Sequence, residues 1–360
     1  MLRKEILLAH FPRITVKRYQ ELLTAFFSID EAWHTTQKDL IHIGWDEKLV
    51  KEFISWRNNC DEEKIEKILE QQNIHCITQE DTEYPTLLKK IYDPPFCLFV
   101  RGSIPHDIYP LAVVGTRKAD GYGKQIIYDI VEPLIQKGFT IVSGLAHGID
   151  AYAHISALDN NAPTIAVLGS GCNDAHIYPA SHRDLAQNIV EKKGAVLSEY
   201  PPGALPNKFT FPRRNRIIAG ISLATLVVQA GEKSGALITA SCSMDNGRDV
   251  FAIPHNIGNP LGIGPNKLIQ QGAQIIMTAQ DIIDALDLQE LPQYVTNKKI
   301  LPTNSTETTI LGQLTKEAQH IDEIIKQSQL NSAEVMSTLT LLEMKGMVKN
   351  LGNMMYIIAY

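Results

Sequence analysis

The chain has 360 residues, of which 44% are apolar and 21% are charged, and these shares are those of an ordinary globular protein with two or three domains. Its net charge of −6 argues against a polycation that coats DNA over its whole surface, but it allows a local basic groove, because phosphate contacts act within about 8 Å in the cell. Five cysteines without a C-x-x-C pair predict a reduced, cytoplasmic protein with neither disulfides nor a zinc site, and the lack of a long apolar run predicts no membrane span.

Residues 1–80 are predicted to form a helical domain. Apolar side chains recur there at helical spacing, and Asp61 is placed to begin a charged helix over residues 64–72. Helical hairpins that touch the DNA backbone do so through a glycine-rich turn, whereas the candidate turn here, residues 11–15, contains no glycine. We therefore expect a packing module rather than a DNA-binding hairpin.

Residues 81–288 are predicted to form a Rossmann-like domain. After a proline-dotted connector with one short strand over residues 97–100, β-branched runs alternate with helical stretches. Nearly continuous apolar strands separated by helices are typical of a doubly wound parallel sheet covered on both faces. The expected strands cover residues 111–115, 140–143, 164–169, 195–198, 223–228, 250–253 and 275–277, and the expected helices include residues 123–137, 149–158, 181–193, 235–246 and 265–271.

The remaining residues are predicted to be a polar linker, 289–305, and a winged helix, 306–360. The pattern over 306–360 is three helices followed by a hairpin. The helix expected over residues 332–345 holds one lysine and two glutamates, whereas a helix that reads duplex DNA normally carries Arg, Lys, Asn or Gln. We therefore interpret the winged helix as an interaction module.

A basic and aromatic cluster lies at residues 208–220, in a window without acidic residues between Glu199 and Glu232. Arginine forks suit phosphate oxygens and aromatic faces suit bases, so the cluster is typical of a groove for single-stranded nucleic acid. The alternative is an arginine-rich helix start that forms salt bridges with acids elsewhere on the surface. The cluster contains Lys208, Phe209, Phe211, Arg213, Arg214, Asn215 and Arg216.

Several loops that follow the expected strands could bind anions, because ligands of open parallel sheets lie beyond the carboxyl ends of the strands. Gly115 and Arg117 follow the first strand, Ser143 and Gly144 follow the second, and residues 169–171 follow the third. Ser234 and Gly235 open a helix and resemble a phosphate site. The alternative for each glycine is a tight turn. There is no G-x-G-x-x-G motif, so we expect no dinucleotide cofactor.

A metal site is a weaker interpretation of the loop after the second strand. His147, Asp150 and His154 have a spacing that could suit ligands, but no further ligand cluster supports them. We expect Asp150 to brace the start of the helix instead, and we expect no metal or other cofactor.

These motifs resemble the DNA-processing protein A (DprA/Smf) family over roughly residues 80–290, in order and in spacing. The matching stretches are GTR at 115–117, SGLAHGID at 143–150, LGSG with YP at 168–179, SEYPPG at 198–203, FPRRNRIIAG at 211–220, SGALITA at 234–240 and GRDVFAIP at 247–254. The resemblance implies a cytoplasmic, non-enzymatic homodimer that binds and protects single-stranded DNA and loads the RecA recombinase during natural transformation of competent cells.

The resemblance also implies roles for particular residues. Arg117 matches an arginine that contacts DNA phosphate, and Lys208 and Phe211 lie where the family has a DNA-contacting lysine and aromatic residue. Arg213, Asn215 and Arg216 are matched to the FPxRNR motif. The chain departs from the family pattern at Gln229, where an acidic residue is usual, and at His255, where glycine is usual.

The function we predict is single-stranded DNA binding, with a nucleotide-processing enzyme as the alternative. Such a phosphoribohydrolase would use Glu199 or Glu232 as an acid or base, but its Pro-Gly-Gly-x-Gly-Thr run is absent. A third, compatible hypothesis is a protein-binding adaptor that uses the winged helix. The predicted DNA-binding residues are Gly115, Arg117, Ser143, Gly144, Lys208, Phe211, Arg213, Asn215, Arg216, Ser234 and Gly235.

Overall fold

The computed structural model describes residues 2–105, 109–288, 305–315, 319–344, 348–352 and 354–358. The chain forms two compact units, Met1–Thr296 and Asn297–Tyr360. Most of the predicted linker, residues 289–304, lies outside the described residues, and the finer division at residues 80 and 288 stays a prediction.

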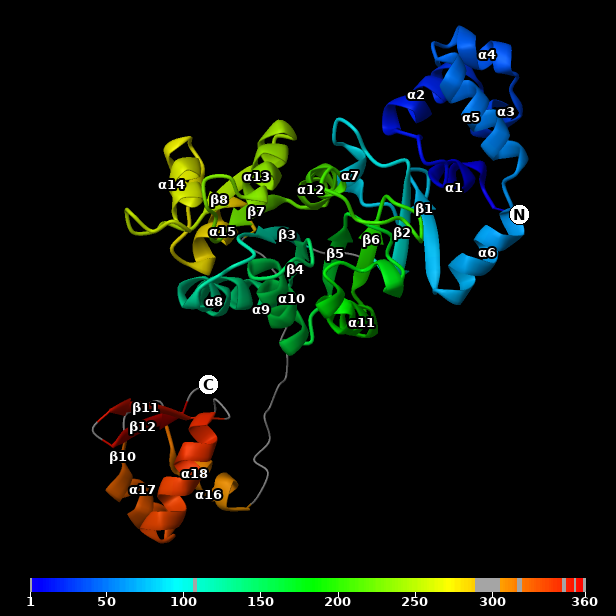
Figure 1. Cartoon of the computed structure of the whole chain (residues 1–360). Helices are drawn as coiled ribbons and strands as arrows, with labels where there is room; N and C mark the ends of the chain where they lie inside the picture. The colour runs from blue at the N-terminus through cyan, green and yellow to red at the C-terminus, as the bar shows by residue number, and fades with distance from the viewer. Residues whose placement is uncertain are drawn as a thin grey trace. The chain divides into compact units, whose positions relative to one another are not determined.

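A single sheet organises the first unit (Figure 1), and among the described residues it has nine strands in the order β1-β2-β6-β5-β4-β3-β7-β8-β9. The pairs from β6 through β9 are parallel, whereas β1 and β2 pair antiparallel with each other and β2 pairs antiparallel with β6. The predicted doubly wound fold is therefore confirmed. The strands are β1 Ile74–Thr78, β2 Cys97–Gly102, β3 Tyr109–Val114, β4 Phe139–Ser143, β5 Thr164–Leu168, β6 Ala195–Ser198, β7 Ala224–Val227, β8 Asp249–Ala252 and β9 Gln274–Ile275.

The strand order contains a switch point between β3 and β7. From β3 the chain adds β4, β5 and β6 on one side, and then returns through α12 (Thr210–Ile221) to add β7, β8 and β9 on the other. At such a point the loops after the two neighbouring strands diverge and leave a crevice at their carboxyl ends.

Helices cover both faces of the sheet, because successive side chains of each strand point to opposite faces. Ala112 and Val114 of β3 belong to one core with α7, α12 and α13, whereas Leu111 and Val113 belong to the other with α8, α9, α10 and α15. Figure 1 shows α12 and α13 on one side of the sheet and α8, α9 and α10 on the other. The helix bounds are α7 Thr86–Lys89, α8 Gly121–Ile126, α9 Glu132–Gln136, α10 Ile149–Asp159, α11 Arg183–Glu191, α13 Gly235–Asp245, α14 Ile263–Gln270 and α15 Ala279–Ala285.

The helix predicted over residues 123–137 is interrupted. A π-helical turn, Ile127–Val131, separates α8 from α9, and Pro133 follows it as the second residue of α9. Because proline has no N–H to donate, the regular ladder of hydrogen bonds cannot run through this point.

The front of the chain forms the predicted helices, and Asp61 caps α6 as expected, since its carboxylate accepts the N–H of Lys64 at 3.0 Å. One strand was not predicted: β1 lies within residues 1–80 and joins the sheet. These helices share one apolar core with β2, β5, β6 and α11. Their bounds are α1 Lys4–Ala9, α2 Val16–Ala25, α3 Ile29–His34, α4 Gln37–His42, α5 Glu47–Asn58 and α6 Glu62–Gln71.

The second unit is the expected winged helix. Its described residues form three helices and a sheet in the order β10-β12-β11, around a separate core that includes Ile310, Ile324, Leu339 and Val348. The elements are α16 Ser305–Gln313, β10 Gln319–His320, α17 Ile321–Ser328, α18 Ser332–Met344, β11 Val348–Gly352 and β12 Met355–Ile358. None of the helices in the described ranges of either unit is long and apolar enough to cross a bilayer.

Candidate nucleic-acid interface

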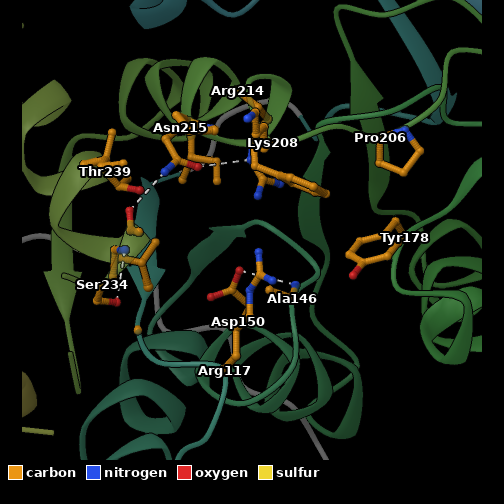
Figure 2. A pocket seen from close by; sticks show the side chains of 18 of the residues that line it. Arg117, Ala146, Asp150, Tyr178, Pro206, Lys208, Arg214, Asn215, Ser234 and Thr239 are labelled. Atoms are coloured by element: carbon orange, nitrogen blue, oxygen red, sulfur yellow. Dashed lines mark hydrogen bonds between the residues drawn. The ribbon is translucent and has the colours of Figure 1, made fainter. Parts of the chain in front are cut away.

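A pocket of about 710 Å³ lies at the switch point between β3 and β7. Its walls come from the loops after β3 and β5, the loop before α10, α12 with the segment before it, and the start of α13. Figure 2 shows Ser234 and Thr239 on one side of this pocket and Tyr178 and Pro206 on the other. Of the predicted site residues, the structure brings seven to this pocket: Gly115, Arg117, Lys208, Phe211, Asn215, Ser234 and Gly235.

Arg117 and Lys208 supply positive charge to the pocket. Both side chains are exposed, and among the described residues neither forms an ion pair. The Arg117 guanidinium lies 5.6 Å from the ring centre of Phe211, and the Lys208 ammonium lies 5.1 Å from that of Phe209. Cations that contact only aromatic faces keep their N–H donors for an anionic ligand.

The two phenylalanines of the basic stretch have different environments. Phe211 lines the pocket, and its ring lies against Gly169, where a Cβ atom would come within 3.0 Å of Phe211 Cδ1. The glycine after β5 therefore serves the close approach of a neighbouring segment. Phe209 is 72% exposed and does not line the pocket.

Two buried side chains, Asp150 and Arg214, hold the loop between β4 and α10. Bracing by Asp150 was expected, whereas the part played by Arg214 was not predicted. The Asp150 carboxylate accepts the N–H of Gly144 at 3.1 Å and that of Ala146 at 3.4 Å. Arg214 donates to the carbonyl of Gly144 at 2.9 Å and also to that of Val167. Arg214 therefore ties α12 to the ends of β4 and β5.

Burial shifts the pKa values of both Asp150 and Arg214. It raises the pKa of Asp150, although the charge of Arg214 and the two backbone N–H groups oppose the rise. Burial also lowers the pKa of Arg214 to about 10, so the guanidinium stays charged at neutral pH. A Cβ atom on Gly144 would lie 2.6 Å from Arg214 Nη2 and 2.7 Å from Asp150 Oδ2, so the pair requires glycine there.

The other four predicted site residues, Ser143, Gly144, Arg213 and Arg216, do not line the pocket. The buried Ser143 hydroxyl donates to the carbonyl of Val113 at 2.6 Å. Arg216 is buried, with Nε 2.8 Å from Asp93 Oδ2 and Nη2 2.6 Å from Glu199 Oε2. Arg213 Nε lies 3.6 Å from the other oxygen of Glu199. These two arginines follow the alternative considered for the basic stretch, a helix start paired with acids.

Asn215, Ser234 and Gly235 organise the start of α13. The Ser234 hydroxyl caps the helix by accepting the N–H of Ala236 at 3.3 Å. Asn215 Nδ2 donates to the carbonyl of Gly235 at 3.1 Å, and its Oδ1 accepts Arg214 Nε at 3.2 Å. Asn215 thus connects α12 to α13, and the positive end of α13 borders the pocket.

Gly115 and the two positions that depart from the family pattern, Gln229 and His255, make packing contacts and hydrogen bonds within the protein. A Cβ atom on Gly115 would lie 2.5 Å from Ile149 Cγ1, so this glycine admits α10 close to β3. Gln229 is buried, and its Nε2 donates to Asp120 at 2.8 Å. The His255 ring lies 5.0 Å from that of Tyr122, outside the pocket lining. Among the described residues, no cluster of three His, Cys, Asp or Glu side chains could hold a metal ion.

Comparison with known families identifies the fold and its motifs. Residues 75–287 match the family model of DNA recombination-mediator protein A, and residues 297–354 match that of the DprA winged helix domain. The chain belongs to the DprA family. Protein Smf of Escherichia coli is 39% identical over 288 residues, which are 78% of this chain and 76% of that protein.

Two solved structures of DprA family members are also similar to this chain. DNA processing protein A from Streptococcus pneumoniae has 34% identity and a TM-score of 0.67, and the match covers 79% of this chain and 98% of that one. DNA processing protein A from Helicobacter pylori, whose structure concerns its single-stranded DNA binding mode, has 30% identity and a TM-score of 0.52 over 59% of this chain and 96% of that one.

Proposed function

We propose that this chain binds single-stranded DNA in the pocket at the switch point. The observation that carries the proposal is the pair of cations, Arg117 and Lys208, that stand beside aromatic rings without an ion-pair partner among the described residues. Phosphates of a strand would lie against these cations and the start of α13, and bases would lie against the aromatic side chains. Membership of the DprA family, one of whose members has a described single-stranded DNA binding mode, supports the proposal.

The cellular role we propose is that of a cytoplasmic recombination mediator. The chain would protect incoming single strands and load the RecA recombinase during natural transformation, as a homodimer. Exposed apolar side chains in and directly after β9, Ile275 and Met277, support self-association. Sedimentation of the purified chain, alone and with RecA, tests self-association and RecA binding. A chain that stays monomeric and does not bind RecA would contradict this role.

We propose no catalytic reaction for the pocket. The phosphoribohydrolase alternative needs a free acid or base, but the Glu199 side chain is 8% exposed and paired with Arg216, and Glu232 lies 2.6 Å from Lys267. The hydrogen bond from Lys267 lowers the pKa of Glu232, which disfavours it as a proton donor. Neither carboxylate lines the pocket.

Substitution of the two cations tests the proposed DNA site. Arg117→Ala and Lys208→Ala should each weaken binding of a single-stranded oligonucleotide by about tenfold or more, because a hydrogen bond to a charged group is lost. Each should also reduce the slope of log affinity against log salt by about 0.7, the value for one phosphate on a single strand. Fluorescence anisotropy across a range of salt concentrations measures both quantities.

Lys192→Ala is the matched control, because it removes the same charge outside the pocket, where Lys192 Nζ contacts Asn161 at 2.8 Å. If Arg117→Ala and Lys208→Ala both bind like this control, the pocket is not the DNA site.

A further inference from the structure

Tyr178 is an aromatic side chain of the pocket to which the motifs assign no role. It lies in the loop after β5, and its ring is tilted by 50° against that of Phe211 with the centres 5.4 Å apart. Figure 2 places it on the wall opposite Ser234 and Thr239. Tyr178 is 45% exposed, so much of its ring is accessible from the pocket.

Phe211 is less available to a ligand than Tyr178. The backbone at Gly169 packs against its ring, and the Arg117 guanidinium lies over it at 5.6 Å. Tyr178 therefore extends the aromatic surface of the pocket beyond a ring that the protein itself already contacts on several sides.

The Tyr178 hydroxyl does not explain the position of the ring. In the part of the chain that the structure describes, no protein group forms a hydrogen bond with this hydroxyl, whereas the buried Tyr84 hydroxyl donates to the carbonyl of Pro95 at 2.6 Å. A half-exposed ring that leans on a second ring and faces a cationic pocket is suited to stacking with a planar, electron-poor ligand.

We infer that Tyr178 stacks on a nucleobase of the bound strand, with Phe211 supporting its ring and Arg117 and Lys208 holding the adjacent phosphates. The inference rests on the proposed function and adds to it a contact with bases. Contacts with phosphates do not depend on whether a base is present, but stacking does. The two kinds of contact can therefore be separated by removing bases from the ligand.

The test compares Tyr178→Leu and Tyr178→Phe on two ligands, an oligothymidylate and an abasic oligonucleotide of the same length. Leucine keeps an apolar side chain against Phe211 but has no aromatic face, so the full-length Tyr178→Leu variant should bind the oligothymidylate about fivefold to a hundredfold more weakly. It should bind the abasic strand like the unchanged protein and keep the same salt slope. Tyr178→Phe should bind both ligands like the unchanged protein.

Tyr122→Leu is the matched control, because Tyr122 is 43% exposed and lies outside the pocket lining. It should leave both affinities unchanged, and unfolding midpoints should show that all the variants are folded. Equal losses on the two ligands would make Tyr178 a structural residue and would overturn the inference, as would no loss on either. If Arg117→Ala still weakens binding in that case, the proposed function stands without the stacking contact. If the unchanged protein binds neither ligand, the proposed function and this inference both fail.

Discussion

Arg213, Arg214 and Arg216 lie within one turn of α12 and have three different environments. Arg214 is buried and donates to backbone carbonyls, Arg216 pairs with Asp93 and Glu199, and Arg213 is exposed beside Glu199. Successive residues of a helix point about 100° apart, so neighbours in sequence face different sides. The positive charge of the pocket therefore comes mainly from Arg117 and Lys208, which belong to loops.

His154 makes the stability of the first unit sensitive to acid. Its ring is buried, with Nδ1 2.8 Å from Thr164 Oγ1 and with no hydrogen-bond partner for Nε2 among the described residues. Burial, with smaller effects from the charges of His182 and Arg214, lowers the pKa of His154 to about 3. Below pH 6.5 the unfolded chain therefore takes up a proton at this histidine that the folded protein does not. The free energy of unfolding decreases as the pH is lowered from 6.5 to about 3.

Replacing this histidine should remove part of that dependence. Within the window His154 contributes a decline of about 1.4 kcal/mol per pH unit in the free energy of unfolding, so His154→Leu should give a shallower profile between pH 6 and about pH 4. Urea unfolding at a series of pH values measures the slope.

Other titrating groups determine how much the stability of His154→Leu should still depend on pH. Burial also lowers the pKa of His10, so some dependence persists in His154→Leu. Carboxylates with a lowered pKa, such as Asp81 and Asp120, lose their stabilising effect only as the pH falls below about 3.8. Identical slopes for the variant and the unchanged protein between pH 6 and about pH 4 would contradict the assignment.

At the scale of elements, the link between α12 and α13 positions one side of the pocket. Asn215→Ala removes the partner of the Gly235 carbonyl and one partner of Arg214, and it should lower the free energy of unfolding by about 1–3 kcal/mol. DNA affinity should also fall because the start of α13 shifts. The salt slope should stay unchanged, because no cationic side chain is removed.

Asn246→Ala tests the other end of the same helix, where Asn246 Nδ2 donates to the carbonyl of Cys242 at 2.6 Å. It should lower stability without changing DNA affinity. If Asn215→Ala reduces the salt slope as much as Arg117→Ala does, Asn215 contacts a phosphate itself and is not only a positioning residue.

The regular elements could largely be predicted from the sequence, because strands buried on both faces are continuous apolar runs. The strand predicted over residues 195–198 matches β6, and most other ends differ by one or two residues. Two features were not predicted, because the local sequence pattern does not distinguish them. β1 is half-polar and pairs with β2 at the edge of the sheet, so its sequence has no continuous apolar run. The apolar residues of the π-helical turn before α9 keep the spacing of an α-helix, so the turn could not be distinguished from a continuous α-helix.

At the scale of the whole molecule, the location of the pocket could be predicted from the sequence better than the residues that hold its walls in position. Arg117, Lys208 and Ser234 could be predicted to meet, because loops after neighbouring parallel strands share one edge of the sheet. The role of Arg214 and the exposure of Tyr178 depend on how α12 and the loop after β5 pack. That packing is a tertiary property without a periodic sequence pattern.

The two units should be separable in function. The winged helix has its own core, and the described residues of α18 include Glu334 and Glu343 but no lysine or arginine. A chain of residues 1–288 should therefore bind single-stranded DNA with the affinity and salt slope of the full chain, because the described helices of the second unit carry one lysine, Lys326, and no arginine. Anisotropy measurements on both chains test this, and a clear loss of affinity in the shorter one would make the winged helix part of the DNA site.

The shared core of α1–α6 and the sheet has a consequence for synthesis on the ribosome. The front helices pack on Ala166, Leu168, Ile189 and Val196, which follow them by many residues. The inner neighbour of β2 is β6, which begins at Ala195, although β2 already ends at Gly102. The emerging chain must therefore carry the unmatched apolar faces of its first helices, together with an open strand edge, until β6 has left the exit tunnel. Its earliest segment is among the last to reach its final packing.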